Sequence, residues 1–120
     1  MSDLDENIFA DPRRLEGDAR AHRFDMLLRS PRTAVMVASL PPGETAARRD
    51  ATDARADRVV YLVEGEARGN VGGREQSLDA GQLLMIPAGR PFQLINTGST
   101  RLLYLDFIAT ETKEKRGDLI

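Results

Sequence analysis

The chain has 120 residues, of which 41% are hydrophobic and 30% charged, and a formal net charge of −2. This balance predicts one soluble globular domain with its own core, and it provides no basic field to attract nucleic acid. There is no cysteine, which excludes disulfides, thiolate nucleophiles and zinc–sulfur sites. No apolar run is long enough to span a membrane, and the acidic start MSDLDENIFA lacks a signal-peptide core. We therefore expect a cytoplasmic protein that binds neither nucleic acid nor membrane.

Residues 1–32 are expected to form an N-terminal arm with short edge strands. Asn7–Phe9 is a short apolar segment suited to an edge strand, which would plug the wall of the domain or contact a second copy. Residues 11–22 are polar and interrupted by proline and glycine, which predicts a loop with at most one helical turn. Residues 24–28 fit helical and strand spacing equally well, and we favour a strand because a clear strand follows.

That clear strand is Thr33–Leu40 (TAVMVASL), which Pro41-Pro42-Gly43 ends. Residues 44–58 form the most charged internal segment, and we expect a mobile, solvated loop there. Four short apolar runs then follow at residues 59–63, 82–86, 92–95 and 101–108.

These runs are too short for helices and are bounded by turn residues such as Asn70–Gly73, so they predict strands. Several short strands with turns between them indicate an antiparallel sandwich or barrel. We place this barrel at residues 33–110 and a polar C-terminal tail at residues 111–120.

The turn residues of this stretch carry a family resemblance. The chain resembles the cupins, whose second motif has the pattern G-x5-P-x-G-x2-H-x3-N. The matching positions here are Gly81, Pro87, Gly89 and Asn96, with Phe92 in place of the metal-binding histidine. In the first motif Arg58 takes the place of the acidic ligand, and Gly65 matches the glycine. The resemblance implies an all-β fold, the double-stranded β-helix or jelly-roll barrel.

The resemblance also implies a metal site, but the ligands are missing. The histidine pair expected within residues 50–55 is absent, and His22 is the only histidine of the chain. Several imidazoles are needed for an iron, manganese or zinc site of this kind, so we predict no metal and no cofactor. An all-oxygen site from Asp50, Asp53 and Asp57 is less favoured than a solvated acidic loop, and a catalytic His22–carboxylate dyad is less favoured than a surface histidine.

A ligand pocket inside the barrel is the remaining chemical possibility. The metal-ligand positions of cupins point inward, so the resemblance implies inward Arg58 and Phe92. Alternation along the strands then turns further residues inward. The candidate barrel-lining, ligand-binding residues are Arg58, Val60, Leu62, Phe92, Leu94 and Tyr104.

Two questions about this pocket stay open at the level of sequence. Either Tyr104 and Asp106 face inward and add a phenol and a carboxylate, or the inward set is Leu103, Leu105 and Phe107. Likewise, either Arg58 meets a small ligand with an apolar body and an anionic head, or Phe92 fills the barrel while Arg58 pairs at the rim. The rim partners considered are Asp53, Asp57 and Glu64.

The sequence favours a metal-free binding or regulatory module for a small organic acid, sugar or aromatic molecule. One alternative is a metal-independent isomerase, epimerase or lyase that uses Arg58 with Tyr104 or Asp106. Another is a filled-barrel interaction domain that works through a dimer face. The sequence does not establish an enzyme and leans against one. The resemblance implies a homodimer, and an exposed edge near Phe9 would otherwise be a liability.

Overall fold

The computed structural model describes residues 9–14, 23–48 and 56–109. Within these ranges, a single turn of 3-10 helix precedes a succession of β-strands. The elements are η1 (Pro12–Arg14), β1 (Arg23–Arg29), β2 (Thr33–Leu40), β3 (Thr45–Arg48), β4 (Arg58–Glu64), β5 (Glu66–Val71), β6 (Arg74–Asp79), β7 (Leu83–Ile86), β8 (Phe92–Asn96) and β9 (Leu102–Ala109).

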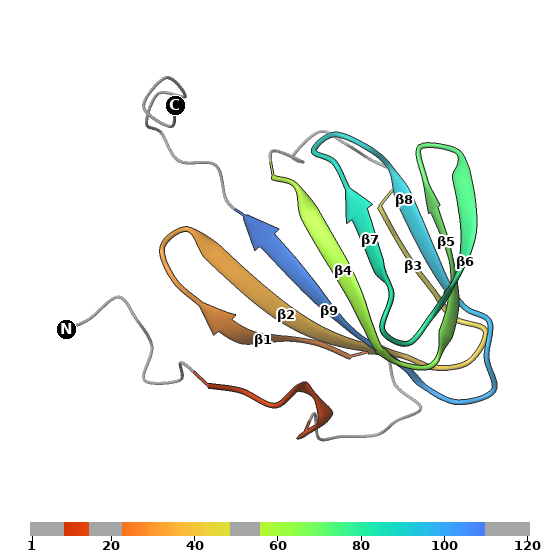
Figure 1. Cartoon of the computed structure of the whole chain (residues 1–120), viewed down its shortest axis with the longest axis horizontal. Helices are drawn as coiled ribbons and strands as arrows, with labels where there is room; N and C mark the ends of the chain where they lie inside the picture. Colours follow the sequence, from red (N-terminus) through yellow and green to blue (C-terminus); the bar gives the residue numbers. More distant parts are fainter. Residues whose placement is uncertain (1–8, 15–22, 49–55, 110–120) are drawn as a thin grey trace.

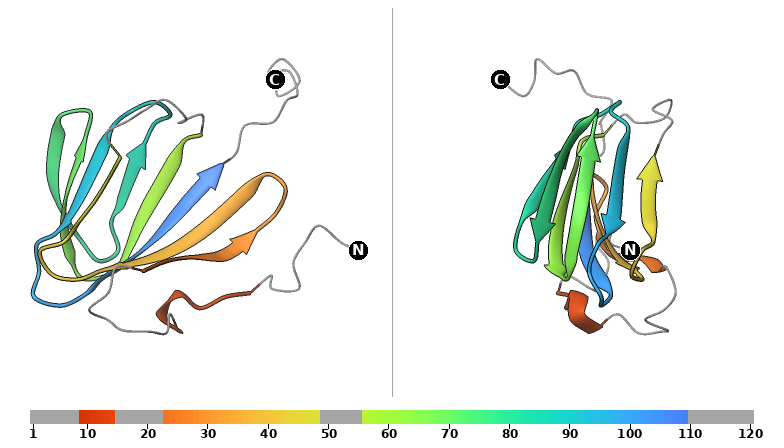
Figure 2. Two further views of the ribbon diagram at one scale, coloured as in Figure 1. Left: turned by 180° about the vertical axis from the view of Figure 1, so that it is seen from behind. Right: turned by 90° about the vertical axis from the view of Figure 1, so that its right-hand side faces the viewer.

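The strands form two facing antiparallel sheets. One sheet has the order β1-β2-β9-β4-β7, and the other has the order β3-β8-β5-β6. Figure 1 shows the strand arrangement, and Figure 2 shows the two sheets as layers. Because the chain crosses repeatedly from one sheet to the other and many paired strands are far apart in sequence, the arrangement is the predicted jelly-roll barrel. The all-β prediction is confirmed.

Most predicted strands lie where the apolar runs placed them. β2 has the predicted bounds, β4, β7, β8 and β9 each begin or end within one residue of a predicted run, and the ambiguous residues 24–28 lie in strand β1. The helical turn expected in residues 11–22 is η1. The prediction of a loop over residues 44–58 is wrong in part, because Thr45–Arg48 pairs with β8 as strand β3.

Strands β5 and β6 were not predicted. In β5 (EARGNV) and β6 (REQSLD) the only side chains buried against the core are those of Ala67 and Leu78. Val71 is partly buried against the core, and the remaining positions carry charged, polar or glycine residues that are typical of loops. Their ladder with each other, from Glu66↔Asp79 to Val71↔Arg74, makes them strands despite this composition. The predicted turn joins them, with positive φ at Gly72 and Gly73.

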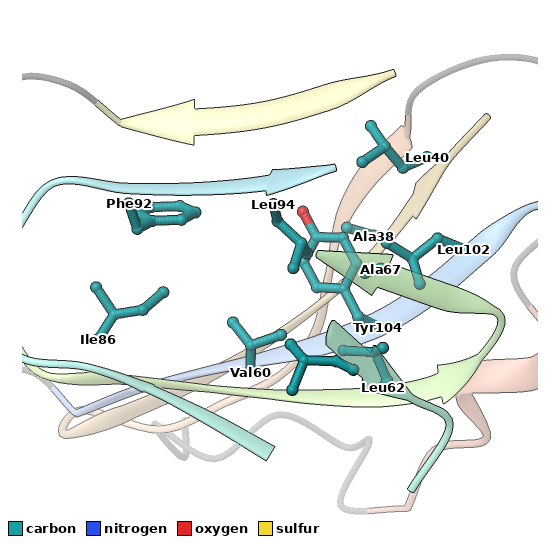
Figure 3. Close-up of a cluster of buried hydrophobic side chains, with 11 residues drawn as sticks. Ala38, Leu40, Val60, Leu62, Ala67, Ile86, Phe92, Leu94, Leu102 and Tyr104 are labelled. Carbon is teal, nitrogen blue, oxygen red and sulfur yellow. The ribbon is translucent and has the colours of Figure 1, made fainter. Parts of the chain in front are cut away.

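The hydrophobic core lies between the two sheets. The clustered side chains in Figure 3 come from both layers, and Leu40, Leu62, Leu94 and Leu102 are each 0–1% exposed. In Figure 3, Ile86 and Phe92 lie at one end of this cluster, whereas Leu40 and Leu102 lie at the other. We call these the Arg58 end, after the residue that contacts Phe92, and the Asn96 end, after the side chain that bonds to Leu40.

Several predictions fall partly or wholly outside the described residues. His22, Asp50 and Asp53 lie there, as do the first two residues of Asn7–Phe9. Phe9 itself is described; it is not in a strand, and it is 86% exposed. Across the described ranges, the structure has no helix with the length and apolar character needed to cross a membrane.

Candidate functional site

The candidate site is built by three strands that meet at the Arg58 end of the barrel. Strand β4 carries Arg58 and Val60, β8 carries Phe92, and β9 carries Tyr104 and Asp106. The β4–β9 ladder places Val60 opposite Asp106 and Leu62 opposite Tyr104, so these side chains share one face.

All six sequence-predicted lining residues lie on the inner faces of the sheets. Val60, Leu62, Phe92, Leu94 and Tyr104 belong to the core cluster, and the Arg58 side chain is only 12% exposed.

The structure decides which face of β9 points inward. Tyr104 is 4% exposed and Asp106 is 0% exposed, and both share a face with the core residues of β4. The alternative inward set of Leu103, Leu105 and Phe107 is therefore wrong. Leu103 is buried on the opposite face beside Ser39, and Phe107 is 37% exposed.

The carboxylate of Asp106 is the partner of Arg58. Arg58 Nε donates to Asp106 Oδ1 and Oδ2 at 3.1 Å each, and Nη2 donates to Oδ2 in a closer contact. The predicted rim pairings are wrong for the two described candidates. Asp57 Oδ1 accepts a hydrogen bond from the backbone N–H of Ala88 at 2.9 Å. Glu64 Oε1 lies 3.7 Å from Arg101 Nη2.

The two substituted motif positions contact each other. The guanidinium carbon of Arg58 lies 4.7 Å from the centre of the Phe92 ring, a cation–π contact. Phe92 thus supports one face of the guanidinium while Asp106 holds one edge. A guanidinium has no lone pair to donate and neither does a phenyl ring, so these two positions do not fit a metal ion. The described part of the chain holds no cluster of three or more His, Cys, Asp or Glu side chains suited to a metal.

Two polar groups at this end have no hydrogen-bond partner among the described residues. Arg58 Nη1 and the Tyr104 hydroxyl make no hydrogen bond, yet no buried side-chain nitrogen or oxygen among the described residues lacks a partner. Both atoms must therefore reach accessible space. Figure 3 shows the Tyr104 hydroxyl pointing from β9 toward the four-stranded sheet.

The hydroxyl of Tyr104 stays protonated, and can donate a hydrogen bond, over the whole physiological pH range. Burial raises the pKa of Tyr104 to about 12, the Asp106 carboxylate adds to the rise, and Arg58 opposes it. The site can therefore offer N–H donors from Arg58 and an O–H donor from Tyr104 beside an aromatic floor. The sequence predicted an inward Asp106 and an inward Tyr104 hydroxyl only as one of two alternatives. Which alternative holds depends on the register between β4 and β9.

The matching motif residues have structural roles instead. Gly81 and Gly89 have φ values of +92° and +82°, which glycine adopts without strain. The Asn96 amide donates to the carbonyls of Leu40 at 2.8 Å and Thr100 at 2.9 Å, and its oxygen accepts the N–H of Gly98 at 2.9 Å. Gly81 and Gly89 thus shape turns, and Asn96 closes the Asn96 end.

This fold, with its motif turns in place, defines the jelly-roll class seen in the cupins. The family model described as "Cupin domain" matches residues 36–108, and the chain belongs to this family. The match spans the interval from β2 to β9, which contains the whole candidate site.

Solved structures support the same fold. The protein TT1209 from Thermus thermophilus is 25% identical with a TM-score of 0.74, covering 87% of this chain and 98% of that one. A cupin superfamily protein from Desulfitobacterium hafniense is 19% identical with a TM-score of 0.72, covering 92% and 97%. An RmlC-like cupin from Shewanella frigidimarina is 20% identical with a TM-score of 0.69, covering 98% and 99%. None of the curated proteins matches in sequence.

Proposed function

We propose that this protein is a metal-independent binding module for a small organic molecule, held at the Arg58 end of the barrel. The observation that carries the proposal is the buried ion pair of Arg58 and Asp106, in which Nη1 of Arg58 has no partner among the described residues. A buried ion pair is often no more stabilising than apolar residues of similar volume. Arg58 and Asp106 lie among the apolar side chains of the core cluster, and Nη1 is left accessible. That arrangement is better explained by recognition than by stability.

The free groups indicate the chemistry of the ligand. Nη1 of Arg58 and the Tyr104 hydroxyl both donate hydrogen bonds, so the ligand must supply oxygen acceptors to each. The Phe92 ring and Val60 offer apolar surface beside them. Because Asp106 balances the charge of Arg58, the pair has no net charge to attract an anion. These features favour an aromatic or sugar-like molecule with carbonyl or hydroxyl oxygens over a free organic acid.

The isomerase, epimerase or lyase alternative has less support. Such a reaction needs a base that reaches the substrate. Both oxygens of Asp106 accept from Arg58, and the residue is 0% exposed. Tyr104, with a pKa of about 12, stays protonated at neutral pH. Neither residue therefore supplies the base that this alternative assigned to them.

A ligand-observed NMR screen with small aromatic and sugar-like compounds tests the binding proposal. The test variant combines Arg58→Met with Asp106→Leu, which removes the donors without leaving a buried charge unpaired. The matched control combines Arg101→Met with Glu64→Leu, a second arginine–carboxylate pair that lies 3.7 Å apart and is more exposed. We expect compounds that bind the wild type and the control but not the test variant. Equal binding to all three, or no binding compound at all, would contradict the proposal.

A dimeric interaction role is a second candidate, and exposed apolar side chains favour it. Phe24 and Met26 of edge strand β1 are 48% and 50% exposed. By register they share the inner face with Ala38 and Met36. Figure 1 shows β1 splayed away from the four-stranded sheet, so that sheet does not cover them. We propose that a second copy of the chain covers this edge.

Light scattering coupled to gel filtration tests the dimer. We expect a dimer for the wild type and a shift toward monomer when Phe24→Ser and Met26→Ser are combined. The matched control changes Leu83→Ser and Met85→Ser, two exposed apolar residues of the opposite edge strand β7. A monomeric wild type, or an unchanged dimer in the β1 variant, would exclude this edge as the interface.

A further inference from the structure

A cavity lies beside the Arg58 end, where strands β6 and β7 form the neighbouring edges of the two sheets. Its volume is about 350 Å³, within the range of small-molecule sites. We call it the β6–β7 cleft. Its floor and walls include Gly69, Val71 and Leu84, and its polar lining residues are Arg74, Glu75, Gln76 and Arg90.

The sheet registers explain why this cleft is apolar inside. Gly69 and Val71 stand opposite Leu94 and Phe92, which are core residues, so they face the space between the sheets. Leu84 faces the same space because it stands opposite Val60. A Cβ at Gly69 would lie 3.2 Å from a Leu78 methyl carbon and 3.3 Å from one of Leu84. Glycine there lets the leucines close the floor and leaves the space above it open.

Two arginines at one end of the cleft have no carboxylate partner in the part of the chain that the structure describes. Arg74 is opposite Val71 and therefore on the cleft side of β6. Arg90 Nη1 would lie 3.1 Å from a Cβ at Gly72, so this guanidinium rests on the β5–β6 turn, two residues from Arg74. Neither arginine forms an ion pair with any residue in the described ranges. Glu75 also lines the cleft, and its Oε1 lies 3.5 Å from Arg68 Nη1 in a solvent-exposed pair.

We infer that the β6–β7 cleft binds a small organic anion with an apolar body, its acidic group held by Arg74 and Arg90. Arginine is suited to this role because its planar fork matches a carboxylate or phosphate group. Two arginines and one carboxylate, that of Glu75, line the cleft, so its net charge is positive, whereas the Arg58–Asp106 pair is neutral. The cleft adjoins the barrel site, but its lining does not include Arg58, Tyr104 or Asp106, and the two sites differ in the charge of the ligand they favour.

Amide chemical shifts in two-dimensional NMR test this inference with naphthoate as the anionic probe and naphthylmethanol as its neutral analogue. We expect saturable shifts at Gly69, Gly72 and Leu84 with naphthoate, and affinity about tenfold or more lower for naphthylmethanol. Combining Arg74→Gln with Arg90→Gln should weaken naphthoate binding by about tenfold or more. The matched control Arg32→Gln removes one exposed arginine from the β1–β2 turn and should leave the affinity unchanged.

The barrel variant that combines Arg58→Met with Asp106→Leu separates this inference from the proposed function, because it should bind naphthoate as the wild type does. The inference is overturned if naphthoate causes no saturable shifts at the cleft. It is also overturned if the alcohol binds equally well, or if the barrel variant rather than the cleft variant loses binding.

Discussion

The Asn96 end and the Arg58 end of the barrel each bury a polar side chain, but they satisfy it differently. Both amide hydrogens of Asn96 go to backbone carbonyls, and its oxygen accepts from a backbone N–H. Arg58 instead pairs with one carboxylate and keeps Nη1 accessible. A group whose partners are all backbone atoms of its own fold stabilises that fold. A group with free donors beside an aromatic ring can bind a ligand, which is the role we propose for Arg58.

The difference also shows how one family motif can change its use. Asn96 and the motif glycines match the residue types of the cupin motif. The glycines form turns, and Asn96 bonds to the backbone. The two metal-ligand positions have become Arg58 and Phe92, which contact each other. The motif residues that match therefore serve turns and backbone contacts, whereas the two substituted positions contact each other inside the barrel.

The largest expected effect follows from breaking the buried ion pair on one side. Arg58→Ala leaves Asp106 charged, fully buried and unpaired, so we expect a loss of about 3–5 kcal/mol in the free energy of unfolding. Combining Arg58→Met with Asp106→Leu should restore most of this loss. Urea unfolding of the single and double variants measures both. If the single variant is as stable as the double, the pair is not buried as described.

The Asn96 end should respond in stability alone. Asn96→Ala removes three hydrogen bonds and leaves backbone groups at Leu40, Thr100 and Gly98 without this partner. We expect a loss of about 2–3 kcal/mol in unfolding free energy. Affinity for any compound bound at the Arg58 end should be unchanged when measured below the unfolding transition. A strong loss of affinity with little loss of stability would reverse the roles assigned to the two ends.

Tyr104 gives the Arg58 end a signature in alkaline solution. Its pKa is raised from 10.0 to about 12 in the folded protein. Because the unfolded chain loses this proton first, stability should fall as the pH rises from 10 to 12, by about 2–3 kcal/mol in total. The measurement is urea unfolding across this pH range with Tyr61→Phe, so that Tyr104 is the remaining tyrosine. Adding Tyr104→Phe should abolish the tyrosine contribution, and an identical pH dependence in both would contradict the raised pKa.

The smallest effect on stability is expected for Tyr104→Phe at neutral pH. The hydroxyl has no hydrogen-bond partner in the described structure, so its removal should change the unfolding free energy by less than about 0.5 kcal/mol. Binding of a ligand that uses this donor should nevertheless weaken by about tenfold. Isothermal titration of a compound from the NMR screen gives the affinity. A large loss of stability would mean that the hydroxyl serves the fold.

Much of the fold could be predicted because its strands are marked by apolar runs and turn residues. Thr33–Leu40 and the run before Glu64 are examples, and the corresponding strands are β2 and β4. Strands β3, β5 and β6 could not be predicted in this way. They have few apolar residues, and their pairing partners in the sheet make them strands.

The site was less predictable than the fold. Motif likeness placed Arg58 and Phe92 inside the barrel, and alternation along β4 placed Val60 and Leu62 with them. The pairing of Arg58 with Asp106 depends on the register between β4 and β9. In this register Val60 stands opposite Asp106, and Arg58 is the next residue of β4 on the same face. A single sequence does not fix this register. The β6–β7 cleft was missed for a related reason, since its arginines come from a strand and a turn whose proximity only the topology provides.

Native mass spectrometry of gently purified protein tests the central claim most directly, because it reports retained metal and organic ligand together. We predict an organic adduct of reproducible mass on the wild type and on the variant that combines Arg101→Met with Glu64→Leu. The variant that combines Arg58→Met with Asp106→Leu should lack this adduct. A bound transition metal on the wild type, or an adduct that persists without Arg58, would contradict the account.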